Sequence, residues 1–100
     1  MSIDPLFRMT VEDVFSIRGR GTVAVGKIEA GTLKSGDRVW LQHAGANREV
    51  TVAGIEMFRK VMDQAGTGDN VGLLLKDLNQ GDIQRGDVLL GSGEDFSWKA

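Results

Sequence analysis

Two apolar runs around a short glycine-containing turn constrain this chain more than any other feature of its sequence. Residues 11–31 read VEDVFSIRGRGTVAVGKIEAG, and runs rich in Val, Phe and Ile flank the turn at residues 18–21. This pattern is typical of a β-hairpin, because neither flank repeats its apolar residues at helical spacing. We therefore predict two antiparallel strands that are joined at this turn.

The first of these strands carries a carboxylate at an unexpected position. Five of its apolar residues have odd numbers, namely Phe7, Met9, Val11, Phe15 and Ile17. A period of two places them on the face toward the core, and Asp13, next to Glu12, then interrupts that face. Either both acids line a polar notch beside Phe15 that accepts hydrogen bonds from a ligand, or a β-bulge leaves them in solvent.

Short alternating segments continue through the middle of the chain. Residues 38–43 alternate between apolar and polar side chains and lead into a hairpin loop at residues 44–47. Residues 48–58 form a long strand whose apolar residues change parity at Gly54. A glycine at such a change indicates a β-bulge, which bends the strand.

One short helix is expected among the strands of the C-terminal half. Residues 60–66 can make a turn or two of helix. Residues 69–77 contain the run at 71–75 that is apolar on both faces, as expected for a strand that is buried on each side. Residues 79–86 form a tight turn or a 3₁₀ turn, and residues 87–91 form a last strand.

Six or seven antiparallel strands with almost no helix define the predicted fold class. We predict an all-β protein, a small closed antiparallel β-barrel, because long bent strands suit a barrel better than a flat sandwich. The chain of 100 residues corresponds to one domain. The barrel is expected to span residues 1–92, and residues 93–100 form a tail that is polar apart from Phe96 and Trp98.

Composition and charge exclude several classes of protein. The chain has no cysteine, which excludes a disulfide framework and a thiolate metal site and fits a cytoplasmic location. A net charge of −2 argues against a globally basic nucleic-acid-binding protein, although a local basic patch is compatible with it. No apolar run has the length of a membrane span.

Catalytic motifs do not stand out in the sequence. The turn Gly19-Arg20-Gly21 lacks the Lys-Ser/Thr pair and the helix of a phosphate-binding loop, so nucleoside triphosphate hydrolysis is not expected. His43 is the only histidine, which excludes a histidine metal cluster, and we expect it at the surface without a catalytic partner. We predict a protein without enzymatic activity, metal or cofactor.

An acid, an aromatic residue and two cations lie at the end of the second long strand. They are Glu56, Phe58, Arg59 and Lys60. This combination suits single-stranded nucleic acid, because an aromatic ring or a flat carboxylate stacks on a base while the cations meet phosphate. A solvated run of charges at a strand end is the alternative interpretation.

Five segments of the chain, taken in order, carry a resemblance to a known family. They are MTVEDVFSI (residues 9–17), GRGTV (19–23), GIEMFRK (54–60), GDNVGLLL (68–75) and GDIQRGDVL (81–89). Over roughly residues 6–91 the chain resembles domain II of bacterial elongation factor Tu. The resemblance implies a closed β-barrel of the translation-factor type and a role in translation elongation. In that family, domain II and a GTP-binding domain share the pocket for the aminoacylated 3′ end of tRNA.

The resemblance also implies a role for each matching residue. The apolar slot for the terminal adenine would consist of Ile17, Gly19, Val23 and Leu74. Glu56 would lie against the adenine or its ribose, and Arg59 near the end of the acceptor strand. The aminoacyl group and its ester would be surrounded by Glu12, Asp13, Phe15, Phe58 and Asn70.

The sequence departs from the family pattern in two places and covers only one of the family's domains. Val25-Gly26-Lys27 replaces the usual Thr-Gly-Arg, so a hydroxyl group is missing near the amino-acid pocket. Trp40 replaces a residue that is generally polar. The chain is therefore either a domain II module that binds the acceptor end weakly, or a free-standing barrel that binds a protein through its Trp40 face.

The implied partners follow from these alternatives. They are the acceptor end of aminoacyl-tRNA and, beyond it, a GTP-binding domain supplied in trans or the ribosome. Neither DNA nor a membrane is expected as a partner. Met1 and the aromatic residues of the tail favour a separately encoded protein over an excised fragment.

Overall fold

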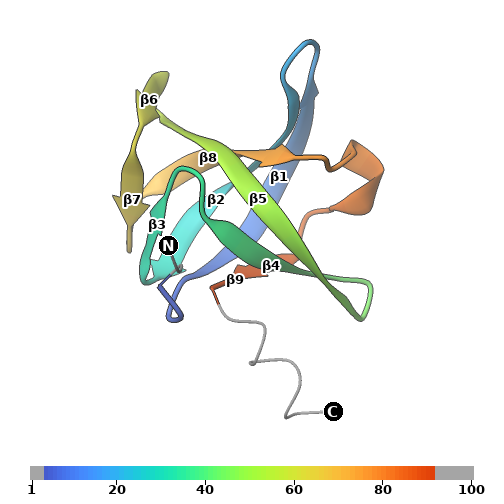
Figure 1. The fold of residues 1–100 in the computed structure, drawn as a ribbon, viewed down its shortest axis with the longest axis horizontal. Coiled ribbons are helices and arrows are strands. Elements are labelled where there is room, and N and C mark those ends of the chain that lie inside the picture. The colour runs from blue at the N-terminus through green and yellow to red at the C-terminus, as the bar shows by residue number, and fades with distance from the viewer. Residues whose placement is uncertain (1–3, 92–100) are drawn as a thin grey trace.

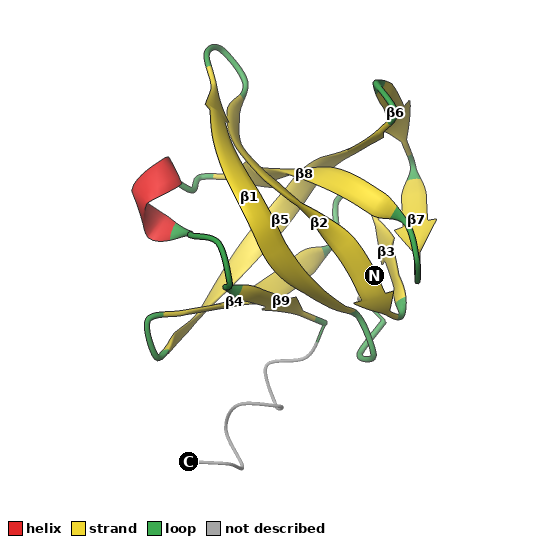
Figure 2. Ribbon diagram, turned by 180° about the vertical axis from the view of Figure 1, so that it is seen from behind, coloured by secondary structure: helices red, strands yellow, loops and turns green. Residues whose placement is uncertain are grey.

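The computed structural model describes residues 4–91 and consists of short strands with one turn of 3₁₀ helix (Figure 1, Figure 2). The elements are β1 (Arg8–Ile17), β2 (Gly21–Ala30), β3 (Thr32–Lys34), β4 (Arg38–His43), β5 (Ala46–Met57), β6 (Lys60–Met62), β7 (Gln64–Gly66), β8 (Asn70–Lys76), η1 (Gln80–Asp82) and β9 (Val88–Leu90). The tail predicted at residues 93–100 lies outside the described residues.

Six of the strands close into a barrel. Hydrogen-bonded neighbours follow the order β4, β9, β1, β2, β8, β5, and β5 pairs again with β4, so the ring has no free edge. All these pairings are antiparallel. Outside the ring, β6 extends β5 as a hairpin, and β3 pairs with β7 in a separate two-stranded sheet. The predicted closed antiparallel β-barrel is confirmed.

The core fills this barrel with side chains that alternate along each strand. In β2 the even-numbered residues 22–28 are buried, whereas the odd-numbered residues are not. At Gly26 the chains approach so closely that a β-carbon would lie 2.4 Å from Thr10 O, so only glycine fits there. The largest fully buried side chains are Phe7, Met9, Ile28, Leu33, Leu41, Ile55, Leu73, Leu75 and Leu89.

Four Gly-Asp pairs share one hydrogen-bond pattern. Each aspartate carboxylate accepts a hydrogen bond from the backbone N–H of the residue three positions earlier, at 2.8–3.0 Å. The N–H of the same aspartate donates to the carbonyl of that earlier residue. Asp37, Asp69 and Asp87 each stand immediately before a strand, and Asp82 lies in η1.

A β-bulge interrupts β1 at Glu12. Val11 pairs with Gly26 and Asp13 pairs with Val25, so Glu12 is an extra residue that opposes none in β2. Glu12 is exposed and Asp13 is half-buried. The predicted β-bulge is therefore present, and it leaves Glu12 but not Asp13 fully in solvent.

The bulge reverses the faces of the second half of β1. Phe15 is 48% exposed and Ile17 is 37% exposed, whereas Val14 packs against the core. The prediction that Phe15 and Ile17 lie on the core face is wrong, because one extra residue shifts a pattern with a period of two. Both side chains become available on the outer surface.

The second predicted bulge lies in β5. Val52 pairs with Leu75 and Gly54 with Leu74, so Ala53 is the extra residue. Val52 and Ile55 are both buried, as the parity change at Gly54 predicts. This bulge is confirmed.

The other predicted strands agree with the structure in position. Residues 38–43, 69–77 and 87–91 correspond to β4, β8 and β9, and the predicted 3₁₀ turn is η1. The outward side chain of Leu74 in β8 is only half-buried, so the expectation of burial on both faces of this strand is wrong there.

The helix predicted at residues 60–66 is wrong. Phe58 and Arg59 reverse the chain in a two-residue turn with positive φ, and β6 then pairs with the end of β5. The following residues form β7, which pairs with β3. These pairings override a weak local preference for helix. No helix among the described residues combines the length and hydrophobicity needed to cross a membrane.

Candidate nucleic-acid interface

The outer face of β1, β2, β8 and β5 brings many of the predicted site residues together. Residues that pair directly across neighbouring strands point to the same face of a sheet. Because Ala24 and Leu73 are buried in the core, the residues that alternate with them face outward. Crossing from β1 to β5, one outward row consists of Phe15, Val23, Leu74 and Gly54. The adjacent row consists of Asp13, Val25, Gly72 and Glu56.

An apolar surface on this face, which we call the outer platform, consists of Phe15, Ile17, Val23 and Leu74. Ile17 pairs with Gly21, and a β-carbon at Gly21 would lie 3.7 Å from Leu74 Cδ1. A β-carbon at Gly72 would lie 3.3 Å from Val23 Cγ1. Because these glycines have no side chain, the backbone of the sheet is uncovered beside the platform, which leaves room for a flat ligand.

An ion pair crosses β8 at the side of the platform. The Nη2 group of Arg20, in the β1–β2 turn, donates to Oε2 of Glu56 in β5. The side chains are 46% and 37% exposed. Glu56 was predicted from the sequence as a site residue and Arg20 was not, because no local signal connects two residues that lie 36 positions apart.

Two hairpins project from the same end of the barrel on either side of β8 (Figure 1, Figure 2). One joins β1 and β2, and the other joins β5 and β6 through Phe58 and Arg59. Phe58 is 85% exposed and Val61, on β6, is 77% exposed. The aromatic side chain expected to meet a ligand is therefore freely accessible at the tip of its hairpin.

The remaining predicted site residues lie at the margins of the platform. Gly19 is in the β1–β2 turn with φ +80° and open space around it, so it contributes backbone only. Asn70 faces outward beside Lys27, four residues from Leu74, which is about 13 Å along an extended strand. Glu12 occupies the bulge of β1.

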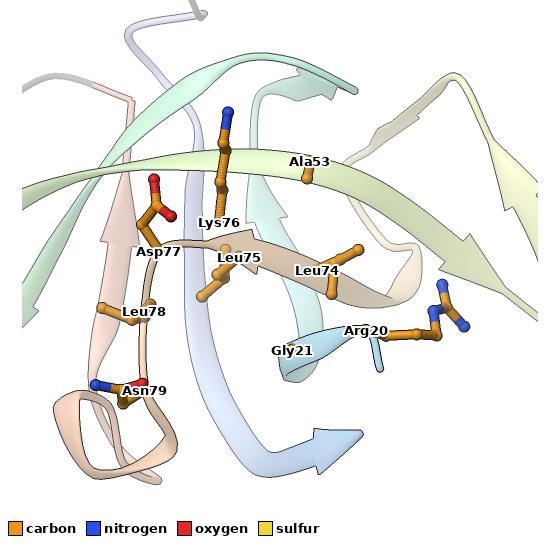
Figure 3. Close-up of a pocket in the computed structure, with 9 residues that line it drawn as sticks. All are labelled: Arg20, Gly21, Ala53, Leu74, Leu75, Lys76, Asp77, Leu78 and Asn79. Carbon is orange, nitrogen blue, oxygen red and sulfur yellow. The ribbon is translucent and has the colours of Figure 1, made fainter. Parts of the chain in front are cut away.

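An open pocket adjoins the platform on the side of the β1–β2 turn (Figure 3). Its volume is about 510 Å³. Its lining includes Leu74, which belongs to the platform, and Gly21, which lies beside the platform. Thr22 Oγ1 donates to Leu78 O at 2.6 Å and so holds the loop that forms one wall. In Figure 3 the Arg20 side chain extends away from Lys76, which agrees with its pairing to Glu56.

Two side chains outside this face differ from their predicted surroundings. His43 is half-buried and not fully at the surface, and its Nδ1 lies 2.6 Å from Asp87 Oδ2, a hydrogen-bond partner that the sequence did not indicate. Trp40 is half-buried on β4 between Glu49 and Leu90, so it offers less surface to a partner than an exposed tryptophan would. Among residues 4–91, no three His, Asp or Glu side chains are grouped so that they could hold a metal ion.

A comparison with protein families identifies the family of this chain. The sequence model of elongation factor Tu domain 2 matches residues 21–90. The matched segment runs from β2 to β9 and contains the predicted site residues from Val23 onward. It covers more than half of the chain. The protein therefore belongs to the elongation factor Tu domain 2 family and is a translation-factor domain II module.

Proposed function

We propose that this domain binds the aminoacylated 3′ end of tRNA on the outer face of β1, β2, β8 and β5. The observation that carries the proposal is that two rows of outward side chains lie side by side on this face. One row belongs to the apolar platform, and the other holds Asp13 and Glu56. Apolar side chains accept the face of a base, and carboxylates accept hydrogen bonds from hydroxyl and amino groups. Membership of the elongation factor Tu domain 2 family supports the same ligand.

In this proposal the terminal adenosine binds on the platform. Its base lies on Val23 and Leu74, with Ile17 and the Gly19 backbone at the edge of the slot. Glu56 lies against the adenine or its ribose. Packing of the base against these aliphatic side chains removes apolar surface from water, which contributes about 25 cal/mol per Å² and makes the platform the main source of affinity.

The aminoacyl group extends from the platform toward the acidic row. Asp13 and Glu12 attract its ammonium group, and Asn70 offers an amide to the ester. The exposed rings of Phe15 and Phe58 are the surfaces available to an amino-acid side chain. Val25 stands between Asp13 and Gly72 in this row, so the wall there is apolar and lacks a hydroxyl group.

The acceptor strand and the missing part of the site explain why we expect weak binding. Arg59 lies near the end of the strand, and neither it nor Lys60 forms an ion pair within the described residues. A few phosphate contacts give a modest affinity that falls with salt. A GTP-binding domain supplied in trans completes the pocket, and the barrel itself performs no chemistry.

The test is an NMR titration with an acceptor-stem minihelix at low salt. A 3′-amide linkage replaces the labile ester, and a minihelix without the amino acid shows what the aminoacyl group adds. We expect shifts on β1, β2 and β8, and a weaker interaction for Glu56→Gln. Glu49→Gln is the matched control, because Glu49 lies in the same strand and also pairs with an arginine, Arg38.

Two results would overturn the proposal. One is the absence of shifts on the outer face at millimolar minihelix. The other is an equal loss of affinity for Glu56→Gln and Glu49→Gln, since that would reflect net charge and not a site.

A further inference from the structure

Among the described residues, the Glu56 side chain has one hydrogen-bond partner that fixes its position. Its cross-strand partner in β8 is Gly72, which has no side chain, and its partner in β6 is Val61, which is 77% exposed. Neither residue can hold a carboxylate. The contact that orients Glu56 is the hydrogen-bonded ion pair with Arg20.

The geometry of this pair leaves one carboxylate oxygen for a ligand. Arg20 engages Oε2, and among the described residues Oε1 has no hydrogen-bond partner. Arg20 reaches Glu56 from the β1–β2 turn, so the pair passes over β8, the strand that carries Leu74. The carboxylate is therefore drawn toward the platform and not outward along β6.

We propose that Arg20 is a positioning residue for the acceptor-end site. It holds the Glu56 carboxylate at the platform before the ligand arrives. Oε1 then accepts a hydrogen bond from the adenosine, and the Glu56 side chain loses no further conformational entropy on binding. This inference rests on the proposed function and adds to it a residue outside the apolar slot. Preorganised groups improve affinity because less conformational entropy is lost on binding.

The size of the effect follows from the exposure of the pair. Ion pairs of this kind contribute about 0.2–1 kcal/mol, so Arg20→Gln should weaken binding of the aminoacylated minihelix by about 1.4- to fivefold. Glu56→Gln should weaken it at least as much. The double variant should bind no more weakly than Glu56→Gln alone, because Arg20 acts through Glu56.

Arg18→Gln is the matched control for the lost charge. Arg18 lies in the same turn, is exposed and forms no ion pair within the described residues. The experiment measures the dissociation constants of wild type and variants for minihelices ending in adenosine and in cytidine. We expect Arg20→Gln to lower the preference for adenosine, Arg20→Lys to restore part of it, and Arg18→Gln to leave it unchanged.

Two other kinds of outcome would count against the positioning role, and only one of them would also count against the proposed function. Equal effects of Arg18→Gln and Arg20→Gln, or tighter binding by Arg20→Gln, would remove the positioning role while leaving the acceptor-end site intact. If wild type does not bind the minihelix at all, the proposed function fails and the positioning role falls with it. An unchanged melting temperature for Arg20→Gln shows that the comparison concerns folded protein.

Discussion

Replacing the Phe58-Arg59 turn with Asn-Gly should stabilise the domain and weaken its binding to the acceptor end. Both residues have left-handed backbone conformations, with φ 53° and 67°. Such a conformation costs a non-glycine residue roughly 1–2 kcal/mol. Asn-Gly is the preferred pair in two-residue hairpin turns in which both residues have positive φ.

The expected gain in stability follows from the cost at each position. Glycine at position 59 removes the steric cost but adds roughly 0.5–1 kcal/mol of conformational entropy, and asparagine recovers part of the cost at position 58. Phe58 is 85% exposed, so its removal sacrifices little burial. We expect a net gain of about 1 kcal/mol, which raises the melting temperature of a domain of this size by about 4–8 °C.

Thermal unfolding followed by circular dichroism measures the gain, and the minihelix titration measures the loss of binding. Ala44→Asn is the control, because Ala44 has φ 52°, precedes Gly45 and lies in the turn at the other end of β5. It should stabilise the barrel without changing the dissociation constant. A strained pair that persists at this turn is consistent with a functional role for it.

Two results would refute this reasoning. If the Asn-Gly variant melts at a lower temperature than wild type, the cost of the left-handed conformation does not govern this turn. If it melts at a higher temperature and binds the minihelix as wild type does, Phe58 and Arg59 contribute nothing to the site.

Three further predictions concern the barrel and its outer face. Gly26→Ala should lower the free energy of unfolding by about 1–3 kcal/mol, because its β-carbon would overlap Thr10 O, and unchanged urea stability would contradict that close approach. Asp87→Ala should cost about 1–3 kcal/mol, since it leaves the Gln84 N–H without its acceptor, and an unaltered urea midpoint would rule this out. Gly72→Ala should weaken minihelix binding, because it places a methyl group beside Glu56, and it should shift the melting temperature little. Unaffected binding would argue against a ligand in the row that holds Asp13 and Glu56.

Alternation and glycine placement predicted much of the barrel, and β5 shows why. Its apolar residues change parity at a glycine, so the bulge left a visible mark in the sequence. In β1 the bulge falls on Glu12, and apolar residues with odd numbers, Met9 and Val11 before it and Phe15 and Ile17 after it, continue on both sides, with Val14 alone at an even position. A period of two therefore placed Phe15 and Ile17 in the core, whereas the extra residue turns them toward solvent.

Segments that depend on long-range pairing were the least predictable. Residues 60–66 form two strands because β5 and β3 supply their partners, and nothing within the segment itself indicates those partners. His43 is a similar case, because Asp87 lies 44 residues away in the sequence and meets it only in the closed barrel.

By itself, the sequence determined that the chain is an antiparallel barrel of the translation-factor type and which residues are candidates for its site. Local alternation, turn chemistry and family motifs are properties of short segments, and they can be read without coordinates. Only the tertiary structure decided that Asp13 and Glu56 share a row, that Phe15 and Ile17 face outward, and that Arg20 pairs with Glu56. These facts depend on the register between strands and on barrel closure, and a single bulge residue is enough to change them.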